Sequence, residues 1–165
     1  MAQTEAQIIR SLIEKWIPLG LEYAEGAEGV TTLFIHAGSE LGAKRANVFF
    51  EQHGKVLYPG KLQGPGNKPG MVHQVQQLLL EDLREAERQF KEAGIACPTE
   101  YRITYEPGPG RRDVELSHEL KYIHHPVKTL QHGPEDWLDG RLEKHYGKLI
   151  PPESEWPATR PARED

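Results

Sequence analysis

The most regular hydrophobic pattern in the chain runs from residue 71 to residue 93. Apolar residues recur there at steps of three and four, which places them on one face of a helix with 3.6 residues per turn. Gly94 follows, and glycine readily adopts the left-handed conformation that ends many helices. We therefore predict a long central helix that covers a sheet with a stripe formed by Val72, Val75, Leu79, Leu83, Ala86, Phe90 and Ala93.

Alternating and β-branched segments on both sides of this helix predict strands. Three short runs at residues 30–35, 47–50 and 55–58 are separated by turns that contain glycine, which indicates an antiparallel meander. Beyond the helix, residues 100–106 and 113–117 alternate apolar with polar side chains on either side of a turn rich in Pro and Gly. This pattern predicts a β-hairpin with one buried face.

Two further helices are predicted at the ends of the folded region. Thr4 is a suitable N-cap for a first helix with a regular apolar face, and Pro18 is expected to end it. Pro134 is expected to open a last helix over residues 135–148.

The predicted fold class is α+β. It consists of an N-terminal helix, an antiparallel three-strand meander, the long central helix packed on the sheet, a β-hairpin and a C-terminal helix. Residues 1–150 are expected to form a single domain, and residues 151–165 a Pro-rich, flexible tail.

Composition bears more on partners than on the fold. The 165 residues carry a formal net charge of −5 and one cysteine, Cys97. We see no signal peptide and no apolar run of bilayer-spanning length, so we expect a cytoplasmic protein without a membrane partner. The acidic balance disfavours direct binding to nucleic acid, which depends on Lys and Arg. The charge is unevenly shared, because residues 41–70 are basic and contain Glu51 as their only acid.

No segment carries a motif that specifies catalysis. Ser117, His118 and Glu119 are triad residue types, but neighbours on a strand point to opposite faces and cannot form a relay. We expect no catalytic residue, no cofactor and no metal site. The alternative is a small-ligand or metal-binding protein, or an enzyme, that uses the histidine-rich region from His118 to His132.

Several local sequences, together with the order of the predicted elements, resemble a known family. They are NVFFE at 47–51, FKEAGI at 90–95, YRITYEP at 101–107, DVELSH at 113–118 and ELKYIH at 119–124. With the opening amphipathic helix, they are similar to the YezG-like family of bacterial immunity proteins, the antitoxins of polymorphic toxin systems. The resemblance covers roughly residues 3–148.

The resemblance implies a non-enzymatic, antitoxin-like protein that binds and blocks a cognate protein toxin, such as a nuclease. An acidic surface suits a toxin with a basic nucleic-acid-binding cleft, because complementary charge speeds association. We therefore expect the toxin-binding surface to draw on acids of the hairpin and of the central helix, namely Glu100, Glu106, Asp113, Glu115, Glu81, Asp82 and Glu85.

Overall fold

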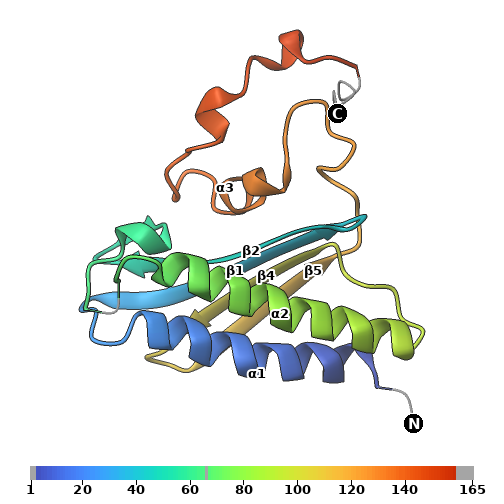
Figure 1. Ribbon diagram of the computed structural model, residues 1–165. Helices are drawn as coiled ribbons and strands as arrows, with labels where there is room; N and C mark the ends of the chain where they lie inside the picture. Colours follow the sequence, from blue (N-terminus) through green and yellow to red (C-terminus); the bar gives the residue numbers. More distant parts are fainter. Residues whose placement is uncertain (1–2, 66, 159–165) are drawn as a thin grey trace.

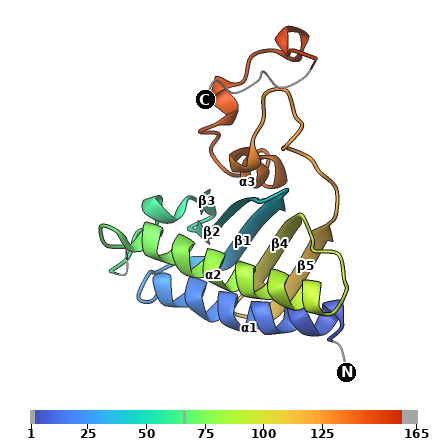
Figure 2. The same cartoon turned by 45° about the vertical axis from the view of Figure 1, so that its right-hand side comes forward.

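The structure, a computed structural model, describes residues 3–65 and 67–158. Its main elements are α1 (Glu5–Tyr23), β1 (Val30–Glu40), β2 (Ala43–Gln52), β3 (Lys55–Leu57), α2 (Met71–Glu92), β4 (Glu100–Glu106), β5 (Arg111–Ser117) and α3 (Gly133–Trp137). All five strands form one antiparallel sheet in the order β3-β2-β1-β4-β5. Helices α1 and α2 lie side by side on one face of it (Figures 1 and 2). The predicted α+β class is confirmed.

Helix α2 confirms the central prediction from the hydrophobic pattern. Leu79, Leu83 and Phe90 on its stripe are fully buried against the sheet and α1. The helix also ends as predicted, because Gly94 has a φ of 71° and the Ile95 N–H donates to the Phe90 carbonyl at 2.9 Å. This hydrogen bond satisfies a carbonyl that the end of the helix would otherwise leave unpaired.

Helix α1 continues past Pro18, so the prediction that this proline ends the helix is wrong. Ile17, Gly20 and Tyr23 extend the buried face on both sides of the proline. Proline removes one helical hydrogen bond, but burial of the continuing apolar face offsets that loss. Gly20 lets the helix approach β1 closely, since a Cβ there would come within 2.7 Å of the Leu33 side chain.

The sheet separates two hydrophobic clusters. The larger lies between the two helices and the strand residues that point toward them, among them Leu33, Phe50 and Ile103. The smaller lies on the opposite face, where Phe34 and Phe49 meet side chains of the C-terminal segment, residues 118–158. Because side chains alternate along a strand, the polar residues of β4 and β5 also face this second side.

The predicted C-terminal helix is present but shorter than expected, because α3 ends at Trp137 and no α-helix continues over residues 138–148. Gly140 has a φ of 79°, and the chain then folds back. Glu135, only 2% exposed, accepts the Tyr146 N–H at 3.0 Å and the Gly147 N–H at 2.9 Å. A buried carboxylate of α3 that caps the returning chain therefore takes the place of the later turns of the expected helix.

Part of the predicted tail is structured. Glu153–Glu155 form a short 3-10 helix, and the Trp156 ring packs edge-on against His125 with centroids 4.9 Å apart. Residues 159–165 of the predicted flexible tail lie outside the described residues, and the division at residue 150 stays a prediction. Within residues 3–65 and 67–158, no helix combines the length and apolar character that crossing a bilayer requires.

Candidate functional site

Glu100 is not on the solvent-exposed surface where it was predicted to contact a toxin. It is 4% exposed, and its carboxylate accepts hydrogen bonds from His36 Nε2 at 2.8 Å, Lys121 Nζ at 2.7 Å and Arg102 Nε at 3.1 Å. Burial alone raises the pKa of this carboxyl, but these hydrogen bonds and charges outweigh it and lower the pKa to about 2. Strand alternation correctly places Glu100 on the sheet face away from the helices. The C-terminal segment covers the end of that face where Glu100 lies.

The remaining six acids lie on two opposite sides of the molecule. Glu106, Asp113 and Glu115 are on the sheet face away from the helices, whereas Glu81, Asp82 and Glu85 are on α2. The structure therefore does not bring them into one surface, because the whole sheet and its core lie between the two groups.

Several of these acids also have partners within the chain. Glu106 pairs with Arg111 at 3.0 Å, and Glu115 approaches Arg102 at 4.0 Å. Hydrogen bonds from Arg88 and Gln89 lower the pKa of Glu85 to about 2, and burial raises the pKa of Asp82. Among the described residues, Glu106, Glu115 and Glu85 form ion pairs, whereas Glu81, Asp82 and Asp113 do not, so the acidic surface is less charged than the sequence suggests.

Histidines of the region from His118 to His132 are engaged in local contacts. His125 Nδ1 accepts the backbone N–H groups of Val127 and Lys128, and His132 Nδ1 accepts the Thr129 N–H at 2.9 Å. His118 pairs with Glu5 at 3.5 Å. In the described ranges, no three His, Cys, Asp or Glu residues are grouped so that they could hold a metal ion. His125 and His132 thus stabilise turns of the segment that contains them, and His118 contacts α1.

Buried carboxylates fix this segment over β1 and β2. Glu40, 2% exposed, accepts the backbone N–H groups of Tyr122 at 3.1 Å and Ile123 at 3.4 Å. Gly133 lies directly on the His36 ring, where an added Cβ would come within 2.5 Å of Cε1. The C-terminal segment thus forms a third layer that faces α2 across the edge of the sheet.

A groove lies between these two layers, along the outer edge of β2. We call it the β2 groove; it has a volume of about 330 Å³. Its floor is β2 from Lys44 to Phe49, one wall is α2, and the other is the C-terminal segment. The residues that line the walls are His73, Gln76, Gln77 and Leu80 of α2, and Leu130, Gln131, Pro134, His145 and Tyr146 of the C-terminal segment.

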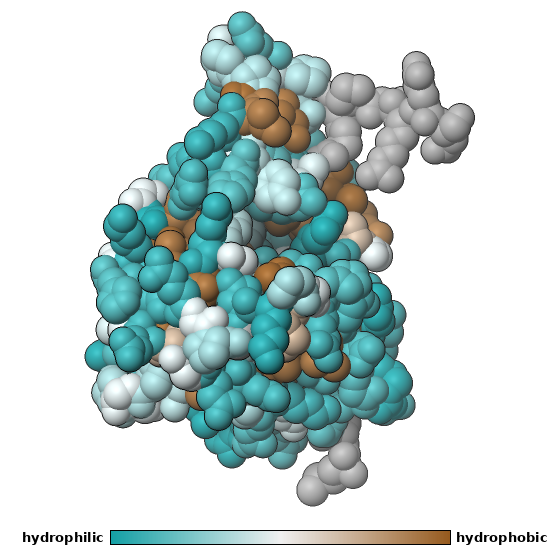
Figure 3. All heavy atoms as spheres, turned by 60° about the vertical axis from the view of Figure 1, so that its left-hand side comes forward, coloured by the Kyte–Doolittle hydropathy of each residue, from teal (hydrophilic) through white to brown (hydrophobic). Residues whose placement is uncertain are grey.

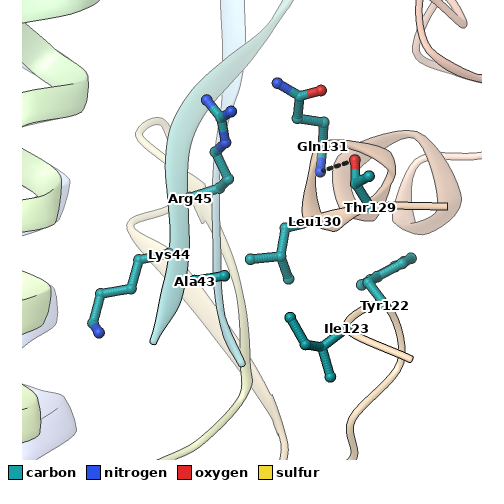
Figure 4. A pocket seen from close by; sticks show the side chains of 8 residues that line it. All are labelled: Ala43, Lys44, Arg45, Tyr122, Ile123, Thr129, Leu130 and Gln131. Atoms are coloured by element: carbon teal, nitrogen blue, oxygen red, sulfur yellow. Dashed lines mark hydrogen bonds between the residues drawn. The ribbon is translucent and has the colours of Figure 1, made fainter. Parts of the chain in front are cut away.

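A smaller hollow of about 210 Å³ lies at the β1–β2 turn end and shares Lys44, Arg45, Leu130 and Gln131 with the β2 groove. Figure 4 shows this end, with Arg45 and Gln131 extending on the same side above the strand. On the face seen in Figure 3, hydrophilic residues cover most of the surface and hydrophobic ones form small groups between them. Any recognition here therefore depends on polar groups as much as on apolar contact.

The floor of the groove is an unpaired strand edge. Strand β3 pairs only with Phe50, Glu51 and Gln52, whereas β2 begins at Ala43. Outward-facing backbone groups alternate along an antiparallel strand. The two-residue turn Leu41–Gly42 makes Glu40 and Ala43 the closing hydrogen-bonded pair with β1, so Lys44, Ala46 and Val48 direct their N–H and C=O groups toward the open edge.

Side-chain hydrogen bonds agree with this assignment. The Val48 N–H donates to Asn47 Oδ1 at 2.9 Å, which it could not do if it were bonded to β1. The N–H groups of Lys44 and Ala46 have no acceptor among the residues that the structure describes. One end of the edge is therefore blocked by a side chain, and the other end is open.

The β2 groove is basic. The exposed Arg45 forms no ion pair with a described residue, and Lys44 pairs with Glu87 at 3.2 Å. His73 and His145 line the walls, and none of the lining residues is Asp or Glu. The positive charge of residues 41–70 is visible in the sequence. The open edge is not, because it depends on the shortness of β3 and on the fold of the C-terminal segment.

Comparisons with known proteins add no family assignment. No protein-family model matches the chain, and a search of curated proteins finds no match. The resemblance to YezG-like immunity proteins therefore stays a prediction.

Proposed function

We propose that this chain is a non-enzymatic, antitoxin-like immunity protein that binds and blocks a cognate protein toxin. The observation that carries the proposal is the open edge of β2 at the floor of the β2 groove. Unpaired backbone donors and acceptors on a strand edge are suited to pairing with another polypeptide. The resemblance in sequence supports the choice of a toxin as that polypeptide.

The shape of the β2 groove fits a protein partner. Its floor follows β2 from Lys44 to Phe49, a distance of about 16 Å at roughly 3.3 Å per strand residue. That length matches a short stretch of extended chain.

The exposed acids of the β4–β5 hairpin offer a second contact in this proposal. Asp113 and Glu115 are exposed, and the 4.0 Å approach to Arg102 is the one ion pair of Glu115 among the described residues. They face solvent on the sheet side away from the helices, and they would attract a basic region of the same toxin before contact. Glu100 has no part in this surface, because it is buried.

Co-expression in a sensitive host tests the proposed function. We expect the chain to restore growth when it is produced together with the toxin encoded beside its gene, and to co-purify with that toxin. The matched control is a Leu83→Asp variant, which removes the fold through the buried core and should not protect. Failure of the parent chain to protect against, or to bind, the neighbouring gene's product would contradict the proposal.

A further inference from the structure

We infer, on the basis of the proposed protein-binding function, that the β2 groove takes an extended acidic segment of the partner as an added β-strand. The segment pairs its backbone with the open N–H and C=O groups of Lys44 and Ala46. Its acidic side chain meets Arg45. The inference rests on three features of the described residues: the open edge, the charge of the groove and the position of its walls.

On the outer edge of β2, the backbone groups of Lys44 and Ala46 are open, whereas the N–H of Val48 is already bonded. Folded proteins normally cover, charge or distort an edge strand to prevent pairing with other chains. Here Asn47 Oδ1 blocks Val48, whereas the backbone groups of Lys44 and Ala46 have no such side chain. Because pairing residues alternate, two open residues accommodate about three to four residues of an added strand. The structure thus limits both the place and the length of the pairing.

The side chains beside this edge favour negative charge. Lys44 is held by Glu87, which also accepts the Ser39 hydroxyl at 2.6 Å, so its ammonium is turned toward α2 and away from the strand edge. Arg45 lies on the opposite side of the strand and is exposed without an ion-pair partner among the described residues. A guanidinium in this situation binds a carboxylate well, through paired hydrogen bonds. Gln76, Gln77 and Gln131 add neutral donors and acceptors on the two walls.

The walls of the β2 groove favour a single extended segment of a partner over a second copy of this chain. The edge lies between α2 and the C-terminal segment, and both supply residues to the same groove. A second copy paired edge to edge would bring its own α2 and C-terminal segment into the space that these walls occupy. A single extended segment of a partner meets no such obstacle. Its two sides would contact the glutamines of α2 on one wall and Gln131 and Tyr146 on the other.

Leu41 provides an apolar contact where the groove reaches the β1–β2 turn. It is 70% exposed and has a φ of 46°, a conformation that leucine adopts at a cost. Asn, Asp or Gly normally occupies this position of a two-residue turn. A large exposed apolar side chain held there is available to a segment that leaves the groove past the turn.

A library of random linear dodecapeptides displayed on phage tests this inference against the full-length chain. We expect enrichment of peptides that contain Asp or Glu next to β-branched residues. In solution, the enriched peptides should slow amide hydrogen exchange at Lys44 and Ala46, measured by NMR. Peptides without acidic residues, or protection only at other amides, would contradict the inference.

Paired variants isolate the backbone contribution. Lys44→Pro removes the open N–H, and Lys44→Ala removes the same side chain but keeps that N–H. We expect the proline variant to bind the enriched peptides at least about tenfold more weakly than the alanine variant, since backbone hydrogen bonds are lost at the open edge. Equal affinities would contradict strand addition.

Arg45→Glu should shift the selected peptides from acidic to basic ones. If the proline variant does not fold, the hydrogen-exchange pattern of the parent chain at Lys44 and Ala46 decides whether a strand is added. An unchanged preference for acidic peptides would remove Arg45 from the site. Asn47→Ala frees the Val48 N–H and should tighten binding. Weaker or unchanged binding by this variant would contradict the assigned pattern of open and blocked backbone groups.

Toxin neutralisation separates this inference from the proposed function. If Lys44→Pro still protects cells as well as Lys44→Ala does, the chain is an immunity protein but the added strand is wrong. If peptides pair with β2 and the parent chain nevertheless fails to protect, the β2 groove binds a segment but the immunity assignment is wrong.

Discussion

Glu100 lies at the centre of a buried charged group that joins His36 on β1, Arg102 on β4 and Lys121 of the C-terminal segment. Removing the Glu100 carboxylate leaves the buried His36 and the half-buried Arg102 and Lys121 without their partner, which is usually costly. His36 is buried as well, and burial lowers its pKa, so its neutral ring donates to the Glu100 carboxylate. The group therefore anchors the C-terminal layer on the sheet.

We predict that Glu100→Gln lowers the free energy of unfolding by about 3 kcal/mol near neutral pH. This is the order expected from a carboxyl whose pKa falls from 4.5 to about 2 on folding. Because the folded pKa is depressed, this stability is present above pH 4.5 and is lost as the pH falls from 4.5 to about 2. Urea unfolding of parent and variant at several pH values measures it.

Glu106→Gln is the matched control, since Glu106 is on the same strand and face but pairs with the exposed Arg111. It should change stability by less than about 1 kcal/mol. If the difference in unfolding free energy between the parent and Glu100→Gln does not shrink as the pH falls, the carboxylate charge is not what stabilises the fold.

A second residue-scale prediction concerns Leu41. Leu41→Asn should raise the free energy of unfolding by up to about 1 kcal/mol, because asparagine tolerates a positive φ better than leucine does. The same change should weaken partner binding if Leu41 supplies an apolar contact. Thermal melts, with Leu41→Val as a control that should destabilise, measure the first effect. A less stable asparagine variant would mean that Leu41 contributes to the free fold.

At the scale of elements, a regular hydrophobic repeat is sufficient to predict a helix or strand that buries one face. The stripe of α2 and the alternation of β4 predicted both elements, since each repeat has the period of its backbone. The ends of the helices are less predictable from the sequence. Pro18 lies inside α1 because the apolar face continues. The helix predicted over residues 135–148 ends at Trp137, and a fold-back held by Glu135 follows it. Both outcomes depend on contacts distant in sequence.

We predict that Leu83→Asp unfolds the protein, because Leu83 is fully buried between α2 and the sheet. An unpaired carboxylate there costs several kcal/mol, about half or more of a typical stability of roughly ten. Leu78→Asp is the control on the same helix, since Leu78 is 38% exposed. It should change the melting temperature little. Two variants that melt alike would place α2 in a different register on the sheet.

At the scale of the whole molecule, charge is arranged differently from the sequence expectation. The predicted acidic residues divide between two opposite sides, and Glu100 is buried. The basic stretch from Lys44 onward instead borders an open strand edge. The sequence shows the basic stretch but not its position in the fold. The β2 groove exists only where a short β3, α2 and the C-terminal segment meet.

The hairpin acids give a prediction at this scale. Asp113→Lys combined with Glu115→Lys should slow association with the toxin at low salt and leave the fold intact, because both side chains are exposed. The difference should fade at high salt, since the Debye length falls from about 10 Å at 0.1 M to about 3 Å at 1 M. Association rates measured across salt concentrations test it. Equal rates at low salt would remove this surface from the complex.

Amide hydrogen exchange, measured with and without the bound toxin, tests whether the toxin adds a strand to β2. Strand addition predicts that binding strongly slows exchange at Lys44 and Ala46, whose N–H groups lie open in the free chain. It also predicts little change at Val48, whose N–H is already bonded to Asn47. Slowed exchange confined to other surfaces, with Lys44 and Ala46 unchanged in the complex, would contradict it.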